Sequence, residues 1–340
     1  MGEKLRTYNF INSVKGGVGK TTLSVFLANY MGKLQMETPE AIKDFSGNVM
    51  LLDLDLQGTA MHYLFEGNAR AKDKGDVYLH QIILNDEEIT RAVCVNKLDG
   101  NLPVINAIFS DDSVEAKLLY RAGAKNNYSS AITYNWFRTG LLRMLEELKY
   151  DGYKHFVFDM PPNFDGFVST SVEAILRAES KENMNINMFF VTGMEPGQIK
   201  VTVEEVKSIF THQEHFMFDN LFIVFNNNIP VLDSYNPEVF KDQVLSCQTL
   251  LNGLLEEEKK HIYYMYMPFH ETYAKFNQTD IGLNHLVAPR EDEENTFNRE
   301  RIFPISPQTY MLDADKNVIY DVTDSNSNSV EKLLQLMLQK

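Results

Sequence analysis

Near its start the chain reads Lys15-Gly16-Gly17-Val18-Gly19-Lys20-Thr21-Thr22, and this stretch decides the fold. Residues 8–13 before it predict a buried strand, and residues 21–32 after it carry apolar side chains at helical spacing. A glycine-rich loop between a strand and a helix N-terminus turns successive backbone N–H groups inward, where the helix dipole adds positive charge. The stretch therefore predicts a phosphate-binding loop in which Lys20 reaches the terminal phosphates and the Thr21 hydroxyl holds Mg²⁺.

This loop departs from the ordinary pattern G-x-x-x-x-G-K-[ST], which requires glycine where the chain has Val14. Instead, Lys15 stands directly before the paired glycines. The variant K-G-G-x-G-K-[ST] resembles the ParA/MinD family of nucleotide-switched ATPases. The resemblance implies that the eight residues 15–22 bind ATP with Mg²⁺. It also implies that Lys15 reaches across a dimer interface to the partner's nucleotide, so that ATP joins a homodimer.

A second motif, at residues 49–58, is an apolar strand that ends in two carboxylates, Asp53 and Asp55. Alternate residues of a strand point to the same side, so both carboxylates can face the phosphates. The resemblance implies that Asp55 helps to place the attacking water and that Asp53 lies nearer the metal. Without the loop upstream, the better interpretation is a pair of carboxylates that caps the next helix.

A third motif, at residues 155–162, brings Asp159 to the C-terminal end of a buried strand, the edge at which open α/β sheets bind ligands. Asp159 resembles a Walker B aspartate, which touches Mg²⁺ directly or through water. Three motifs in this order make the resemblance specific, and it extends over residues 4–282.

The adenine-binding side of the site is predicted from resemblance alone. A strand at residues 221–225 ends in Asn226, and an asparagine in that place commonly contacts the adenine, with Asn227 and Asn228 as alternatives. Residues 264–267 resemble the last core strand, and Pro268 begins the loop that closes over the base.

Strand and helix patterns alternate from residue 5 to about residue 268, which predicts an α/β fold: a mostly parallel sheet of the P-loop NTPase type with helices on both faces. We expect residues 1–282 to form the ATPase core, residues 283–323 an accessory insertion, and residues 324–340 a C-terminal helix packed on the core. Within the insertion, two apolar runs flank residues 313–317 and predict a β-hairpin. That hairpin either meets a partner or covers a sheet edge.

The C-terminal helix could instead lie on a membrane, as in a MinD-type protein. Anchors of that kind are rich in Lys and Arg on their polar face, and here only Lys332 and Lys340 qualify. Packing against the core is therefore the prediction for its apolar residues, which are Val330, Leu333, Leu334, Met337 and Leu338.

Composition narrows the class of protein. The 340 residues are 44% hydrophobic and 23% charged, which is ordinary for a globular protein, and no apolar run has the roughly 18–20 residues of a membrane span. The two cysteines, Cys94 and Cys247, favour a reducing cytoplasm and cannot hold an iron–sulfur cluster at short spacing. His212 and His215 are interpreted as polar residues at a helix end rather than as metal ligands.

The leading hypothesis is a ParA-like ATPase in which two protomers sandwich two ATP·Mg²⁺ units and hydrolyse them slowly. A ParB-like or other partner would stimulate hydrolysis, and the cargo would be plasmid or chromosomal DNA. The net charge of −15 does not help binding to non-specific DNA, although it leaves room for a basic patch formed on dimerisation. The catalytic residues would be Lys15, Lys20 and Asp55, and the metal residues Thr21, Asp53 and Asp159.

Two other classes stay open. A positioning or regulatory switch that acts on proteins, MinD-like or otherwise, is favoured by the acidic balance and by the insertion at residues 283–323. A metabolic ligase of the dethiobiotin-synthetase kind shares the fold, but Lys15 and the Asp53–Asp55 motif fit it less well.

Overall fold

The computed structural model describes residues 6–32, 49–55, 79, 82, 94–96, 102–105, 128–162, 174–175, 177–179, 183–212, 218–226, 237–252, 262–267, 310–312, 318–320 and 329–338. Pro268, Asn227, Asn228 and His215 lie outside these ranges, as does most of the predicted insertion.

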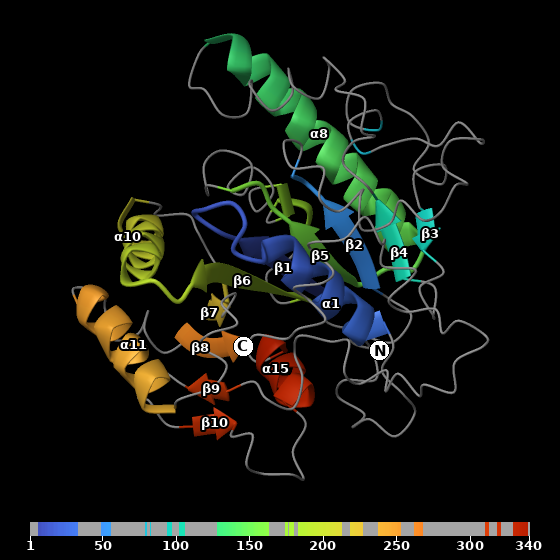
Figure 1. Cartoon of the computed structure of the whole chain (residues 1–340). Helices are drawn as coiled ribbons and strands as arrows, with labels where there is room; N and C mark the ends of the chain where they lie inside the picture. The colour runs from blue at the N-terminus through green and yellow to red at the C-terminus, as the bar shows by residue number, and fades with distance from the viewer. Residues whose placement is uncertain are drawn as a thin grey trace, which may run out of the picture.

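A ten-stranded sheet in the order β10-β9-β8-β7-β6-β1-β5-β2-β4-β3 runs through the molecule (Figure 1). Along the part of this order that reads β8-β7-β6-β1-β5-β2-β4, each strand is parallel to the next. Strands β3, β9 and β10 are antiparallel to their neighbours. The mostly parallel sheet predicted from the sequence is thus confirmed. The strands are β1 (Arg6–Asn12), β2 (Val49–Asp53), β3 (Cys94–Asn96), β4 (Leu102–Ile105), β5 (His155–Asp159), β6 (Met184–Gly193), β7 (Asn220–Asn226), β8 (Ile262–Met267), β9 (Tyr310–Leu312) and β10 (Val318–Tyr320).

Helices cover both faces of the sheet. One face carries α1 (Lys20–Gly32) and α15 (Ser329–Met337), and the other carries α8 (Tyr128–Tyr150), α10 (Pro196–His212) and α11 (Pro237–Leu250) (Figure 1). Strands β9 and β10 form the predicted hairpin, and β9 extends the sheet beside β8.

The central strands are buried on both faces because each face has its own apolar core. Alternate residues point to opposite sides, so Phe10 and Phe158 join the core under α8, α10 and α11, whereas Ile11 and Val157 join the core under α1 and α15. The rings of Phe10 and Phe158 stack with centroids 4.7 Å apart. This two-sided burial explains why β5 carries an unbroken apolar run at residues 156–158 rather than an alternating pattern.

A row of buried asparagines crosses three neighbouring strands and holds the C-terminal end of α15. Asn9, Asn187 and Asn220 are register partners on β1, β6 and β7. Asn187 Nδ2 donates to Asn9 Oδ1 at 2.8 Å, and Asn220 Nδ2 donates to Asn187 Oδ1 at 2.9 Å. Asn187 Nδ2 also donates to the carbonyl oxygen of Met337 at 3.2 Å, and Asn220 Nδ2 donates to the carbonyl oxygen of Leu336 at 3.1 Å. Helix ends leave such carbonyls without helical partners, so the row fixes where α15 ends on the sheet.

The apolar side of α15 faces the sheet. Leu333, Leu334, Leu336 and Met337 are all buried in the same core as α1. Within the residues described, no helix combines the length and apolar character that crossing a membrane requires.

Replacing Asn187 by leucine is expected to destabilise the protein by about 1–3 kcal/mol, because buried Asn9 Oδ1 loses its donor, while Asn220 Nδ2 and the carbonyl of Met337 each lose one of their partners. Urea unfolding of the ligand-free protein measures the effect. Glu204→Gln, on the exposed side of α10, is the control and should stay within about 0.5 kcal/mol of wild type. Equal stability of the two variants would show that the asparagine row contributes nothing.

Candidate functional site

The loop between β1 and α1 is shaped by two glycines with positive φ. Gly17 and Gly19 have φ of 78° and 93°, in the left-handed region that glycine adopts readily. A Cβ built on Gly17 would meet nothing within 4 Å, so the backbone angle, rather than crowding, requires glycine there. Gly16 and Gly17 are exposed while Val18 is buried, which anchors the loop and leaves its glycines accessible.

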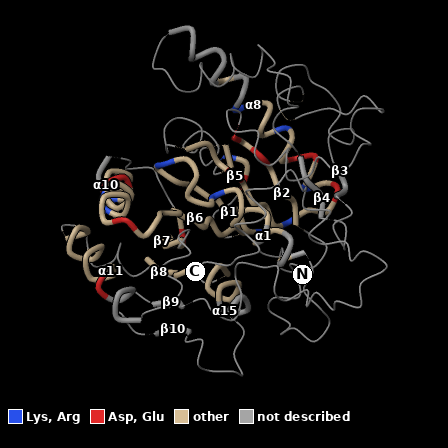
Figure 2. The backbone as a smooth tube through the Cα atoms, in the orientation of Figure 1, with Lys and Arg blue, Asp and Glu red and all other residues tan. Residues whose placement is uncertain are grey.

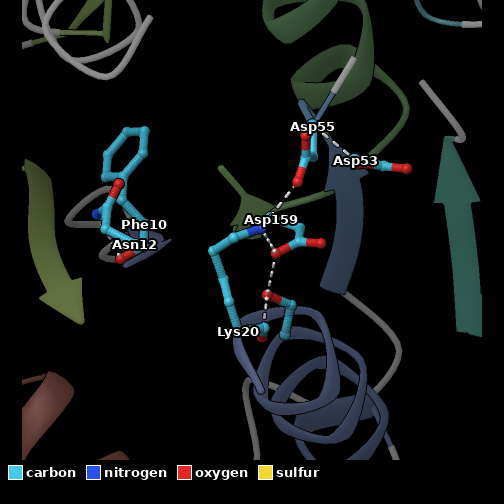
Figure 3. Close-up of polar contacts among 7 residues, drawn as sticks. Phe10, Asn12, Lys20, Asp53, Asp55 and Asp159 are labelled. Atoms are coloured by element: carbon cyan, nitrogen blue, oxygen red, sulfur yellow. Dashed lines mark hydrogen bonds and ion pairs between the residues drawn. The ribbon is translucent and has the colours of Figure 1, made fainter. Parts of the chain in front are cut away.

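Lys20, the first residue of α1, is a buried cation held by two carboxylates. Its Nζ lies 3.1 Å from Asp159 Oδ1 and 3.2 Å from Asp55 Oδ2, and its exposed fraction is 6% (Figure 3). Asp159 ends β5, and Asp55 lies two residues beyond the end of β2. Burial alone lowers the pKa of Lys20, but the charges of Asp159 and Asp55 outweigh it and raise this pKa above its ordinary value. Lys20 is therefore a charged group at neutral pH.

Asp53 adds a third carboxylate to the cluster. It ends β2 as the register partner of Asp159, and its Oδ1 accepts a hydrogen bond from the Asp55 backbone N–H at 3.0 Å. Burial, and then the charges of Asp159 and Asp55, raise the pKa of Asp53 well above its usual range. Burial also raises the pKa of Asp159, against the opposing charge of Lys20. Two carboxylates thus contact one lysine and a third lies beside them (Figure 3), so the carboxylates outnumber the cation that neutralises them.

The oxygen atoms at this edge of the sheet fit Mg²⁺. Asp159 Oδ1 accepts hydrogen bonds from Lys20 and, at 3.0 Å, from Ser24 Oγ, and the Thr21 side chain also bonds to this carboxylate. Asp159 Oδ2 is buried and has no hydrogen-bond partner. In the described parts of the chain, no three His, Cys, Asp or Glu side chains are grouped to hold a metal by themselves. Mg²⁺ typically uses one or two carboxylates together with phosphate oxygens and water, and Asp159 with its unpartnered Oδ2 is such a carboxylate.

The structure brings most of the sequence-predicted site together. Lys20, Thr21, Asp53, Asp55 and Asp159 converge at the C-terminal ends of β1, β2 and β5, the edge expected for ligands in an open α/β sheet. Asp53 and Asp55, from the motif at residues 49–58, therefore lie beside the phosphate loop. The roles assigned to these two carboxylates from the resemblance remain predictions.

Two of the predicted residues lie at the margin of this cluster. Lys15 is exposed and forms no ion pair with any other part of the chain that the structure describes. Asn226, assigned to the adenine from the sequence, donates from Nδ2 to the carbonyl of Val18 at 2.7 Å. Sequence reasoning missed this bond and the contact of Ser24, whose only signal was its position one helical turn after Lys20.

Replacing Asp53 by asparagine is expected to stabilise the ligand-free protein by about 1 kcal/mol at neutral pH. The asparagine oxygen can still accept the hydrogen bond from the Asp55 N–H, while the charge that Asp159 and Asp55 repel is gone. Urea unfolding measures the difference, with the exposed Asp242→Asn as a control that should stay within about 0.5 kcal/mol of wild type.

The gain from Asp53→Asn should depend on pH in one direction. Because the pKa of Asp53 is raised on folding, the stability that this residue contributes is fully present below the unfolded-state pKa of about 3.9 and is lost as pH rises through the folded-state pKa. The advantage of the variant should therefore grow with pH from about 4 upward and then level off. A variant less stable than wild type at neutral pH contradicts the charge excess inferred for the cluster.

Comparisons with known proteins agree with this fold. Residues 7–180, just over half of the chain, match the model of a family described as an AAA domain. Among similar solved structures, a protein of Borrelia burgdorferi B31 named for plasmid partition and bound to AMPPNP has 15% identity and a TM-score of 0.51, with 88% of this chain and 96% of that chain covered. The MinD cell division protein of Aquifex aeolicus has 14% identity and a TM-score of 0.50, with 88% and 94% covered. No curated protein matches the chain.

Proposed function

The chain belongs to the AAA-domain family, and we propose that it is a P-loop ATPase of the ParA/MinD type. In this proposal it acts as an ATP-driven switch that positions DNA. Two protomers would bind two ATP·Mg²⁺ units between them, and hydrolysis would separate them. The observation that supports this most is the arrangement of Lys20 between Asp55 and Asp159 at the end of a glycine-rich loop.

Each residue of the cluster has a role in phosphoryl transfer to water, a reaction that depends mainly on positioning and charge neutralisation. Lys20 binds the terminal phosphates through its charged Nζ, and Lys15 adds a second positive charge to the partner's nucleotide. Asp55, released from Lys20, orients the attacking water. Thr21 and Asp159 would hold Mg²⁺ with Asp53 beside them, and the metal would neutralise phosphate charge. Turnover would be slow, because the time before ATP is hydrolysed sets how long the protein stays in its ATP-bound state.

DNA is proposed as the cargo because of the plasmid-partition name of the Borrelia burgdorferi B31 protein, which is bound to AMPPNP. The net charge is −15, and acidic and basic residues are interspersed along the described backbone (Figure 2). A DNA-binding surface would therefore form when two protomers join and bring their basic residues together. A ParB-like protein would be the stimulating partner, and the cytoplasm the compartment.

Binding of the protein to non-specific duplex DNA tests the proposal that DNA is the cargo. The measurement compares protein with ATP, with ADP and without nucleotide over a salt series. Binding that requires ATP and weakens steeply with salt is expected, since phosphate contacts release counterions. The absence of binding in every condition, beside intact ATP hydrolysis, would overturn the DNA role.

That second outcome would favour a MinD-like or other switch directed at proteins. The similarity to the MinD cell division protein of Aquifex aeolicus and the acidic net charge support this candidate. A membrane role for α15 fits less well, because its apolar residues are buried against the sheet and its last carbonyls are bound by the asparagine row.

A further inference from the structure

One hydrogen bond joins the end of β7, two strands away from β1 in the sheet, to the phosphate loop. Asn226, the last residue of β7, is held by backbone pairing to β6 on one side and to β8 on the other. Its side chain is buried, and its Nδ2 donates to the carbonyl oxygen of Val18 at 2.7 Å, across 208 positions of sequence. The donor is thus fixed by the sheet, and the acceptor lies in the middle of the loop.

The acceptor determines which way one loop N–H points. Val18 lies between Gly17 and Gly19, the two loop residues with positive φ. In a trans peptide the C=O of Val18 and the N–H of Gly19 point in opposite directions. A Val18 carbonyl directed at Asn226 therefore directs the Gly19 N–H away from β7. That N–H immediately precedes Lys20, in the part of the loop where backbone donors bind phosphate.

We propose that Asn226 is a positioning residue for the phosphate loop, acting on the triphosphate through the Val18–Gly19 peptide. This inference rests on the proposed binding of ATP and goes beyond the adenine contact expected for Asn226 from the sequence. It predicts that a ligand without any base also depends on Asn226. An asparagine that only contacts adenine has no effect on such a ligand.

The test compares two ligands on one variant, Asn226→Ala, by calorimetric titration with Mg²⁺ present. The ligands are ATP and inorganic tripolyphosphate, which keeps the phosphates and lacks the nucleoside. Loss of one loop-fixing hydrogen bond should weaken both by a similar factor, about 5- to 10-fold. Asn252→Ala, an exposed asparagine after α11, is the matched control and should change neither affinity.

Each outcome decides something different. A loss for ATP alone, or for neither ligand, overturns the positioning role. Wild-type protein that binds neither ligand overturns the proposed ATP binding itself, and the positioning role with it. Should Asn226→Ala melt too low for titration, Asn226→Ser gives the same comparison, because the readout is a ratio between two ligands on one folded protein.

Discussion

Replacing Lys20 by alanine is expected to lower ATP hydrolysis on the order of 10²–10³-fold, the usual cost of removing a preorganised charge that faces a transition state. The same change should destabilise the ligand-free protein by about 3–5 kcal/mol, because it leaves Asp55 and Asp159 buried without their cation. Steady-state phosphate release and urea unfolding measure the two effects. Lys200→Ala, on the exposed side of α10, should change neither.

The two effects of Lys20 can be separated by a second substitution. Adding Asp55→Asn to Lys20→Ala removes one of the two stranded charges, so the double variant should regain part of the lost stability. It should regain no activity, because the phosphates still lack the Lys20 charge. A double variant as unstable as Lys20→Ala alone would contradict the electrostatic account of this cluster.

The second large effect is expected at Lys15. Replacing it by glutamine should abolish nucleotide-dependent dimerisation while the monomer still binds ATP within a few-fold of wild type. The reason is that Lys15 is exposed in the loop, where its charge can reach a second protomer.

Hydrolysis rate per protomer against protein concentration provides the readout for Lys15→Gln. Wild type should become more active per protomer as concentration rises and dimers form, whereas the variant should show no such rise. The matched control is Lys200→Gln, whose side chain is 63% exposed and remote in sequence from the loop. A concentration dependence that Lys15→Gln leaves intact would mean that Lys15 plays no part in joining protomers.

The strand, loop and helix around Lys20 could be predicted because each part has a local signature. Glycines set the loop, and the apolar periodicity changes from strand to helix at Thr21. The meeting of Lys20 with Asp159, 139 positions away, follows from one further rule: parallel strands end at a common edge, and both carboxylate motifs end strands. The AAA-domain match confirms the family that these motifs indicated.

What the sequence could not show depends on strand register and tertiary packing. Asn9, Asn187 and Asn220 lie far apart in sequence in three strands, and only the register makes them neighbours and places the end of α15 above them. The bond from Asn226 to Val18 has the same origin, because no local pattern connects the end of β7 with the loop after β1. The helical pattern at residues 330–338 predicted α15, but its position on the face it shares with α1 is set by packing.

The mass of the wild-type protein in solution, measured by sedimentation with Mg²⁺ and either ATP or ADP, tests the nucleotide switch most directly. With ATP we expect a dimer, twice the chain mass of 39.1 kDa, and with ADP a monomer. An identical mass with both nucleotides would contradict the proposal that ATP joins two copies of this chain.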